Sequence, residues 1–207
     1  PGLLTEWGWS EDKTKVTMTV REGVTWHDGS PFTAEDVAWS LTRAADEKID
    51  IRVGTVVFTI MHFVPLLALF TGVHWSAWII MAVLYLARVF FITAGYHRYF
   101  AHRSYRMGRF MQFLMGFAGT TAVQKGPLWW AAHHRHHHKH SDDQEDIHSP
   151  KRGFWWSHTG WILCKKYDKT HHDLIPDFTK YPELRFIDKF DWIAPLLLGV
   201  AVWGLGY

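Results

Sequence analysis

Residues 53–72 read VGTVVFTIMHFVPLLALFTG and contain no Lys, Arg, Asp or Glu. At a rise of about 1.5 Å per residue, about 20 apolar residues cross the roughly 30 Å hydrocarbon core of a bilayer. A second apolar run, residues 74–95, is interrupted only by Arg88, and residues 192–207 begin a third. Because two such runs in succession exceed the usual helix length of soluble proteins, a buried soluble hairpin is the less favoured alternative. The sequence therefore predicts an all-α transmembrane helical bundle with spans near residues 53–72 and 74–95 and a third span that is truncated.

The first 48 residues have a different composition. They carry 5 Lys and Arg against 9 Asp and Glu, a net charge of −4, whereas residues 49–207 carry 17 against 11, a net charge of +6. Residues 14–20 alternate polar and apolar side chains, many of them β-branched, which predicts a strand. Residues 33–46 predict a short helix that Thr33 and Asp36 cap reciprocally. We therefore expect a small α+β fragment at residues 1–48 and a membrane domain at residues 49–207.

Charge and cysteine content further constrain the membrane domain. Arg98, Arg103, Arg106 and Arg109 follow the second apolar run, with no acidic residue between positions 97 and 109. Because basic residues are enriched on the cytoplasmic side of membranes, we expect this side to be cytoplasmic. The one cysteine, Cys164, excludes an intrachain disulfide, so a metal site must use histidine and carboxylate ligands.

Fifteen histidines are present, and they are concentrated after the second apolar run. His97 and His102 are five residues apart, which is about 140° around an ideal α-helix. We therefore expect them to flank one helix face, unless the helix ends there or both imidazoles reach a site between them.

The stretch WWAAHHRHHHKHSDD, residues 129–143, holds six histidines. A helix would place His134, His137 and His138 on one side, and would do nearly as well for His133, His137 and His140. Spacing alone leaves both alternatives open. Imidazoles without a thiolate suit Fe, Cu, Ni or Zn, whereas a solvated basic patch and a pH-sensitive switch are weaker interpretations. Two histidine clusters that follow apolar segments on the same membrane side favour a shared metal site.

Three segments together carry a resemblance to a known family: GYHRYFAHRSY at residues 95–105, HRHHH at residues 134–138 and IHSPKRGFWWSHTGW at residues 147–161. They resemble the bacterial form of the stearoyl-type membrane acyl-CoA desaturases, and the resemblance covers about residues 52–207. It implies a desaturase-like fold with metal ligands at His97, His102, His134, His137 and His138.

In this family the histidines bind two irons, which activate O2 and remove hydrogen from an unactivated methylene of a long acyl chain to leave a cis double bond. The resemblance implies a fatty acyl-CoA or acyl-carrier thioester, O2, a lipid bilayer and an electron donor (a cytochrome, a ferredoxin or a flavoprotein reductase) as partners, and no nucleic acid. It also implies a multi-pass protein of the bacterial inner membrane with its histidine boxes on the cytoplasmic side. Because the third histidine box of the family is absent, we expect an incomplete iron site. An inactive chimeric fragment and a related di-iron membrane hydroxylase are the alternatives.

The resemblance also implies roles for residues outside the boxes. The expected substrate-binding residues are Gln124, Trp130, Arg135, Lys165 and Lys166, for which packing, anchoring or snorkelling at the membrane interface is the alternative. The expected partners that orient the imidazoles are Asp142, Asp143, Asp146, His148 and His158, for which a solvated acidic turn or a structural role is the alternative.

A second resemblance lies near the start of the chain. REGVTWHDGSPFTAEDVAWSLTRA, residues 21–44, resembles a signature of the peptide-binding family of extracellular solute-binding proteins, and the likeness covers about residues 1–46. A member of that family needs several hundred more residues to close two lobes around a peptide, so we do not expect a peptide-binding module. The sequence therefore predicts a composite of two unrelated pieces.

Overall fold

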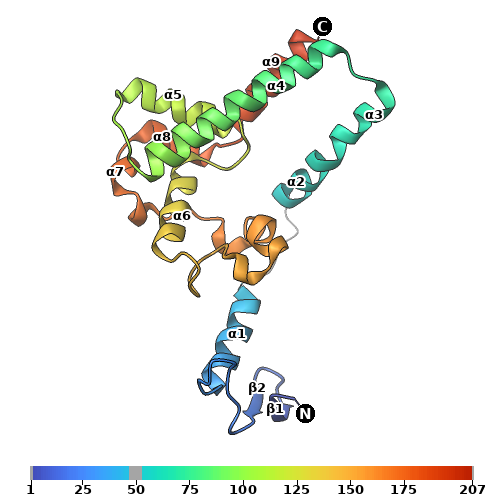
Figure 1. The fold of residues 1–207 in the computed structure, drawn as a ribbon, viewed down its shortest axis with the longest axis vertical. Helices are drawn as coiled ribbons and strands as arrows, with labels where there is room; N and C mark the ends of the chain where they lie inside the picture. Colours follow the sequence, from blue (N-terminus) through green and yellow to red (C-terminus); the bar gives the residue numbers. More distant parts are fainter. Residues whose placement is uncertain (1, 47–52, 207) are drawn as a thin grey trace. The chain divides into compact units, whose positions relative to one another are not determined.

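The computed structural model describes residues 2–46 and 53–206 and divides the chain into two compact units, residues 1–48 and 49–207 (Figure 1). In the first unit, β1 (Leu4–Trp9) and β2 (Val16–Val20) form an antiparallel pair with Trp7 opposite Met18. β2 confirms the strand predicted at residues 14–20. β1 was not predicted, because its sequence LTEWGW contains Glu and Gly, which are depleted in strands.

The helix of the first unit, α1 (Ala34–Asp46), begins with the expected reciprocal cap. The backbone N–H of Thr33 donates to Asp36 Oδ2 at 2.7 Å, and the N–H of Asp36 donates to Thr33 Oγ1 at 3.4 Å. The sheet buries little apolar surface, since Trp7 and Trp9 are 69% and 61% exposed. Local capping and turn contacts, more than a hydrophobic core, therefore define this unit.

The second unit begins with three short apolar helices: α2 (Val53–Phe63), the 3₁₀-helix η1 (Val64–Leu67) and α3 (Ala68–Thr71). Pro65 explains the interruption, because it lacks an N–H and its ring disfavours α-helical geometry in the residue before it. The apolar helical stretch Thr55–Thr71 has 17 residues, fewer than the roughly 20 residues of a span. The predicted continuous span at 53–72 is therefore not confirmed.

The next helix is the one candidate membrane span among the residues that the structure describes. α4 (Trp75–Phe90) continues directly into the π-helix η2 (Phe91–Ala101), which makes one helix of 27 residues from Trp75 to Ala101. The predicted second span, residues 74–95, lies almost entirely within this helix, which continues with π geometry to Ala101. α9 (Ile193–Leu205), where a third span was expected to begin, has 13 residues and is shorter than a span.

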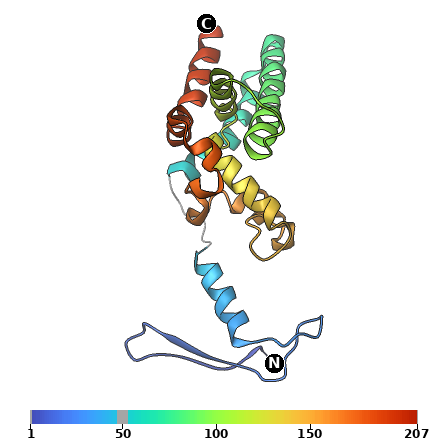
Figure 2. The same cartoon turned by 90° about the vertical axis from the view of Figure 1, so that its left-hand side faces the viewer.

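Shorter helices complete the second unit (Figure 2). α5 (Arg109–Thr120) is largely apolar, and α6 (Pro127–Lys139) carries the histidine-rich stretch. The remaining elements are η3 (Pro150–Arg152), the π-helical turn η4 (Trp156–Gly160), η5 (Lys165–Tyr167), η6 (His172–Leu174), α7 (Pro176–Thr179) and α8 (Pro182–Lys189).

The core of the second unit lies where η2, α5, α6 and α8 meet. Its fully buried side chains are Tyr96, Phe100, Leu128, Ile175 and Leu184. The Tyr96 hydroxyl donates to the backbone carbonyl of Lys125 at 3.1 Å, so its buried polar atom has a partner. This core holds the end of η2 against α6, the two elements that carry the histidines.

Candidate metal centre

The π-helix η2 brings His97 and His102 to the same side of the backbone. The N–H of His102 donates to the carbonyl of His97 at 3.0 Å, the i to i+5 hydrogen bond of π geometry. The two Nε2 atoms lie 3.2 Å apart. η2 ends at Ala101 with His102 at its C-cap, so the stated alternative, a helix end that brings both imidazoles to one site, applies here in place of the flanking arrangement of an ideal α-helix.

Contacts from α8 position the start of α6. Pro127 occupies the first turn, and the Asp188 carboxylate accepts the N–H groups of Leu128 and Trp129 at 2.9 and 2.8 Å. These N–H groups have no acceptor within the helix, and the Asp188 carboxylate accepts their hydrogen bonds. Its negative charge also interacts favourably with the positive end of the helix dipole. Thr170 Oγ1 donates to the other Asp188 oxygen at 2.7 Å. The first turn of α6 is thus fixed by a residue about 60 positions away.

His134 and His138 stand one turn apart on α6, with their Nε2 atoms 3.0 Å apart. The Trp130 indole stacks on the His134 ring at a centroid distance of 4.6 Å. Trp130 Nε1 also donates to Gln124 Oε1 at 3.2 Å. Two of the residues predicted to bind substrate, Trp130 and Gln124, therefore contact each other, and one of them contacts a predicted metal ligand.

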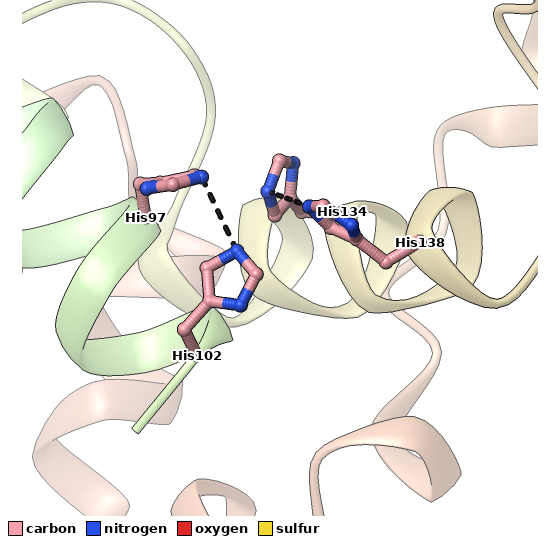
Figure 3. A group of neighbouring side chains, drawn as sticks. All are labelled: His97, His102, His134 and His138. Atoms are coloured by element: carbon pink, nitrogen blue, oxygen red, sulfur yellow. Dashed lines mark hydrogen bonds between the residues drawn. The ribbon is translucent and has the colours of Figure 1, made fainter. Parts of the chain in front are cut away.

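The four imidazoles of His97, His102, His134 and His138 point toward one another from two helices (Figure 3). One nitrogen from each lies within 4.8 Å of the others, and the His97–His134 and His102–His138 ring centroids are each 4.7 Å apart. Two nitrogens bound at about 2.1 Å to one metal lie about 3.0 Å apart at a right angle and about 3.4 Å at the tetrahedral angle. The observed pairs at 3.0 and 3.2 Å fit that geometry. We call this group the four-histidine cluster.

Electrostatics favour the neutral, metal-binding form of two members of the four-histidine cluster. Burial, assisted by the neighbouring imidazoles, lowers the pKa of His134 to about 3. Burial also lowers the pKa of His102, again assisted by neighbouring His97 and His138. A metal ligand must be a neutral imidazole, so these groups require no deprotonation near neutral pH.

His137, the fifth predicted ligand, belongs to a second group with Asp146 and His148. Its Nδ1 lies 2.9 Å from Asp146 Oδ1, and its ring stacks on His148 at 4.1 Å. Burial would raise the pKa of Asp146, but hydrogen bonds from His137 and two backbone N–H groups outweigh burial and hold the pKa below its ordinary value. Asp146 is therefore an ionised acceptor that can orient His137. The His134 and His137 rings are 6.2 Å apart, so the two groups are adjacent.

All five guanidinium N–H groups of Arg135 are used within the protein. Its Nη atoms meet the Asp177 carboxylate at 2.8 and 2.9 Å, and its other contacts are to backbone carbonyls. The carbonyls belong to Phe100, Ala101 and Leu174. The substrate-binding role of Arg135 stays a prediction, and this geometry favours a positioning role instead.

Other predicted site residues lie outside the four-histidine cluster. Asp143 contacts His140 at 3.2 Å, and Asp142 accepts a hydrogen bond from Ser149 at 3.5 Å, so neither of these contacts involves one of the five predicted ligands. His158 stacks on Phe154 at 5.4 Å, and Lys165 and Lys166 are exposed in η5. The roles predicted for these residues remain predictions.

Two residues that shape the site were missed from the sequence. Asp177 and Asp188 stand 42 and 60 residues from their partners Arg135 and Leu128. Asp177 lies in the four-residue helix α7 and Asp188 in the charge-rich helix α8, and no local pattern distinguishes either from a solvated carboxylate. Only the folded chain brings these carboxylates to α6.

Known proteins resemble this chain in two separate ways. Over most of its length it resembles fatty acid desaturases. An sn-1 stearoyl-lipid 9-desaturase of Anabaena variabilis is 34% identical over 173 residues, which are 80% of this chain and 62% of that protein. A delta-9 acyl-lipid desaturase of Arabidopsis thaliana is 34% identical over 155 residues (73% of this chain, 50% of that protein), and an acyl-CoA 5-desaturase of Anemone leveillei is 35% identical over 133 residues (62% and 41%).

The start of the chain matches a different family. Residues 1–57 match the model of bacterial extracellular solute-binding proteins, family 5 middle. The expectation of a chain composed of two unrelated pieces is therefore confirmed. The chain spans 41% to 62% of the length of the three desaturases above.

Proposed function

We propose that residues 52–207 form part of an oxygen-dependent fatty acyl desaturase with a di-iron site. The four-histidine cluster would hold one iron, and His137 would reach the second. The observation that carries this proposal is the convergence of four imidazoles from η2 and α6 within 4.8 Å. The identity to desaturases at 34–35% supports the same reaction class.

The donor set fits iron. Imidazole suits Fe as well as Zn, Cu and Ni, and it is not oxidised as a thiolate ligand would be. When bound, the metal pair supplies the O2 activation needed to remove hydrogen from a methylene. Asp146 accepts the Nδ1–H of His137 and leaves its Nε2 lone pair free for the metal. Trp130 holds the His134 ring by stacking, and burial keeps that ring neutral.

The acyl chain would approach beside Trp130 and Gln124, which we propose as substrate-contacting residues. Trp130 contacts both His134 and His97, at ring distances of 4.6 and 6.3 Å, so its indole borders the four-histidine cluster. An apolar wall next to the metal suits a hydrocarbon chain and excludes water. The relatives' names include both acyl-lipid and acyl-CoA desaturases, and we propose a long-chain fatty acyl ester or thioester as the substrate class.

We also propose a membrane location with the histidines on the cytoplasmic side. The most apolar part of the helix Trp75–Ala101 has no buried residue, and the side chains of Val83, Tyr85 and Leu86 are each at least 60% exposed. A surface this apolar suits contact with lipid. Arg98 and Arg103 at its end favour the cytoplasmic face. O2 and an electron-donating cytochrome, ferredoxin or flavoprotein reductase are the further partners of the proposed reaction.

Bound iron tests the site before any activity assay. The chain, purified in detergent under reducing conditions, should contain bound iron, up to two irons per chain, by elemental analysis. The variant His134→Ala/His137→Ala/His138→Ala should lose this iron, while His171→Ala/His172→Ala, which removes two exposed histidines at the start of η6, should keep it. Equal iron in all three proteins would contradict the proposed site.

Product analysis then tests the reaction. Membranes with the chain, O2 and a reductant are supplied with stearoyl-CoA or with a stearoyl glycerolipid, and the acyl products are analysed by mass spectrometry. A product two hydrogens lighter supports desaturation, and the productive substrate distinguishes thioester from lipid. A product heavier by one oxygen would instead identify a hydroxylase, and an iron-loaded chain without either product would overturn the proposed activity.

A further inference from the structure

Two further histidines on α6 repeat the spacing of the pair in the four-histidine cluster. His136 and His140 are four residues apart, with ring centroids 4.6 Å apart, compared with 4.5 Å for His134 and His138. Each lies two residues beyond its counterpart, which is about 200° around the helix. This second pair therefore faces away from the four-histidine cluster and cannot share its metal ion.

A carboxylate from the turn after α6 completes a group around the second pair. Glu145 Oε2 lies 3.2 Å from His140 Nδ1, and the Glu145 backbone carbonyl lies 3.0 Å from His136 Nε2. One ligand atom each from His136, His140 and Glu145 lies within 4.8 Å of the others. Asp143 Oδ2 also lies 3.2 Å from His140 Nδ1, so a second carboxylate borders the group.

We propose that His136, His140 and Glu145 form a separate site for a late first-row divalent cation such as Zn²⁺. Two imidazoles and one carboxylate are a familiar zinc ligand set, with water in the remaining position. Two ligands of one metal at about 2.1 Å are at most about 4.2 Å apart, so a small movement of the Glu145 side chain closes the group. A neutral His140 imidazole that binds the cation through Nδ1 carries its proton on Nε2, and the cation replaces the direct contact between His140 Nδ1 and Glu145.

The accessibility of the group suits an exchangeable ion. The His140 side chain is 17% exposed, which gives one protected ligand, whereas the Glu145 side chain is 68% exposed and opens the site to solvent. Binding ties the end of α6 to the turn that continues into Asp146. Since Asp146 contacts His137, the cation stabilises the segment that orients a predicted iron ligand. The site stands independently of the proposed desaturase activity.

Zinc stoichiometry tests the assignment. The full chain in detergent is freed of metal with a chelator and dialysed against a fixed free Zn²⁺ concentration, and bound Zn²⁺ is measured by elemental analysis. The variant His136→Gln/His140→Gln should bind one Zn²⁺ fewer than the unaltered chain. The matched variant His171→Gln/His172→Gln should bind as much Zn²⁺ as the unaltered chain. The variant His134→Gln/His138→Gln should keep the Zn²⁺ bound by His136, His140 and Glu145, which we call the outer site. Unchanged zinc content in His136→Gln/His140→Gln would overturn the proposal.

A single substitution in the turn provides a second test that leaves α6 intact. Glu145→Gln keeps the size of an exposed side chain, and circular dichroism checks that helix content is unchanged. It should weaken Zn²⁺ binding at the outer site at least tenfold when measured in the His134→Gln/His138→Gln background. Equal Zn²⁺ affinity with and without Glu145→Gln would overturn the three-ligand site, whatever the double histidine variant does.

Discussion

Arg135 and Asp177 form a two-point ion pair, with nitrogen to oxygen distances of 2.8 and 2.9 Å across 42 residues of chain. Their side chains are only 21% and 15% exposed. Arg135 lies next to His134 on α6, and two of its other N–H groups donate to the carbonyls of Phe100 and Ala101 at the end of η2, just before His102. Arg135 therefore links the two helices whose imidazoles meet in the four-histidine cluster, and Asp177 on α7 holds its guanidinium in place.

Breaking this pair from one side should destabilise the second unit. Asp177→Ala leaves the largely buried Arg135 guanidinium without its carboxylate, and we expect a loss of about 3 kcal/mol in the free energy of unfolding. Thermal unfolding in detergent, followed by circular dichroism, measures the effect. Glu183→Gln, which breaks an exposed pair with Arg109, should have a clearly smaller effect. Similar losses in the two variants would contradict the anchoring role of Asp177.

The same pair predicts a dependence of stability on pH. Burial raises the pKa of Asp177, but the hydrogen bonds and charge of Arg135 outweigh burial and hold the pKa below its ordinary value of 3.8. A depressed carboxyl pKa stabilises the fold above the unfolded value, and this contribution is lost as the pH falls through the lower, folded pKa. Thermal unfolding should therefore show an acid-dependent loss below pH 3.8 that is reduced in Asp177→Asn. An identical acid dependence in this variant would exclude Asp177 as its source.

Asp188 should be required for the ordered start of α6. Asp188→Ala removes the acceptor for Leu128 N–H and Trp129 N–H, and we expect a cost of about 1–3 kcal/mol. Asp188→Asn keeps one carbonyl acceptor and should cost less. Amide hydrogen exchange over the first turn of α6 should accelerate in the alanine variant. Unchanged exchange there would mean that Asp188 does not hold this helix end.

Patterns within a few residues were enough to predict part of this structure. The reciprocal cap of Thr33 and Asp36 forms as expected, because a capping contact depends only on neighbouring residues. The helix beginning near residue 75 follows equally from its apolar composition, which only Arg88 interrupts. The convergence of His134 and His138 needs only helical spacing, whereas the choice of this face over that of His133 needed the resemblance to desaturases.

Features that depend on distant contacts or unusual backbone geometry could not be predicted. No local pattern predicts that η2 is a π-helix that ends at Ala101, so the sequence left open whether His97 and His102 flank a helix face or approach each other, as they do. The break at Pro65 shortens an apolar run whose composition alone suggests a full span. Asp146 is an expected partner of the imidazoles, but which histidine it contacts, His137, depends on the path of the turn beyond the helix.

Gly119 on α5 should tolerate no side chain. A methyl group there would overlap the ring of the fully buried Tyr96, which precedes His97 on η2. We expect Gly119→Ala to cost about 1–3 kcal/mol and to weaken metal binding at the four-histidine cluster. Gly199→Ala, in α9, is the matched control, because nothing lies within 4 Å of its added methyl group. Alanine there should be neutral or stabilising by up to about 1 kcal/mol, and equal behaviour of the two variants would contradict the packing argument.

Asp146 should control the metal affinity of His137 without being needed for the fold around the four-histidine cluster. Asp146→Asn removes the charge that favours a proton on His137 Nδ1, and loss of such a partner typically weakens metal binding about 10–100-fold. Iron titration of the chelator-treated chain should therefore show one weakened site, while the tighter binding at His97 and His134 persists. Asp173→Asn, at an exposed position in η6, should leave both iron affinities unchanged. If Asp146→Asn binds iron as the unaltered chain does, the carboxylate only closes its turn, through the N–H groups of Asp142 and His148, and does not tune the metal.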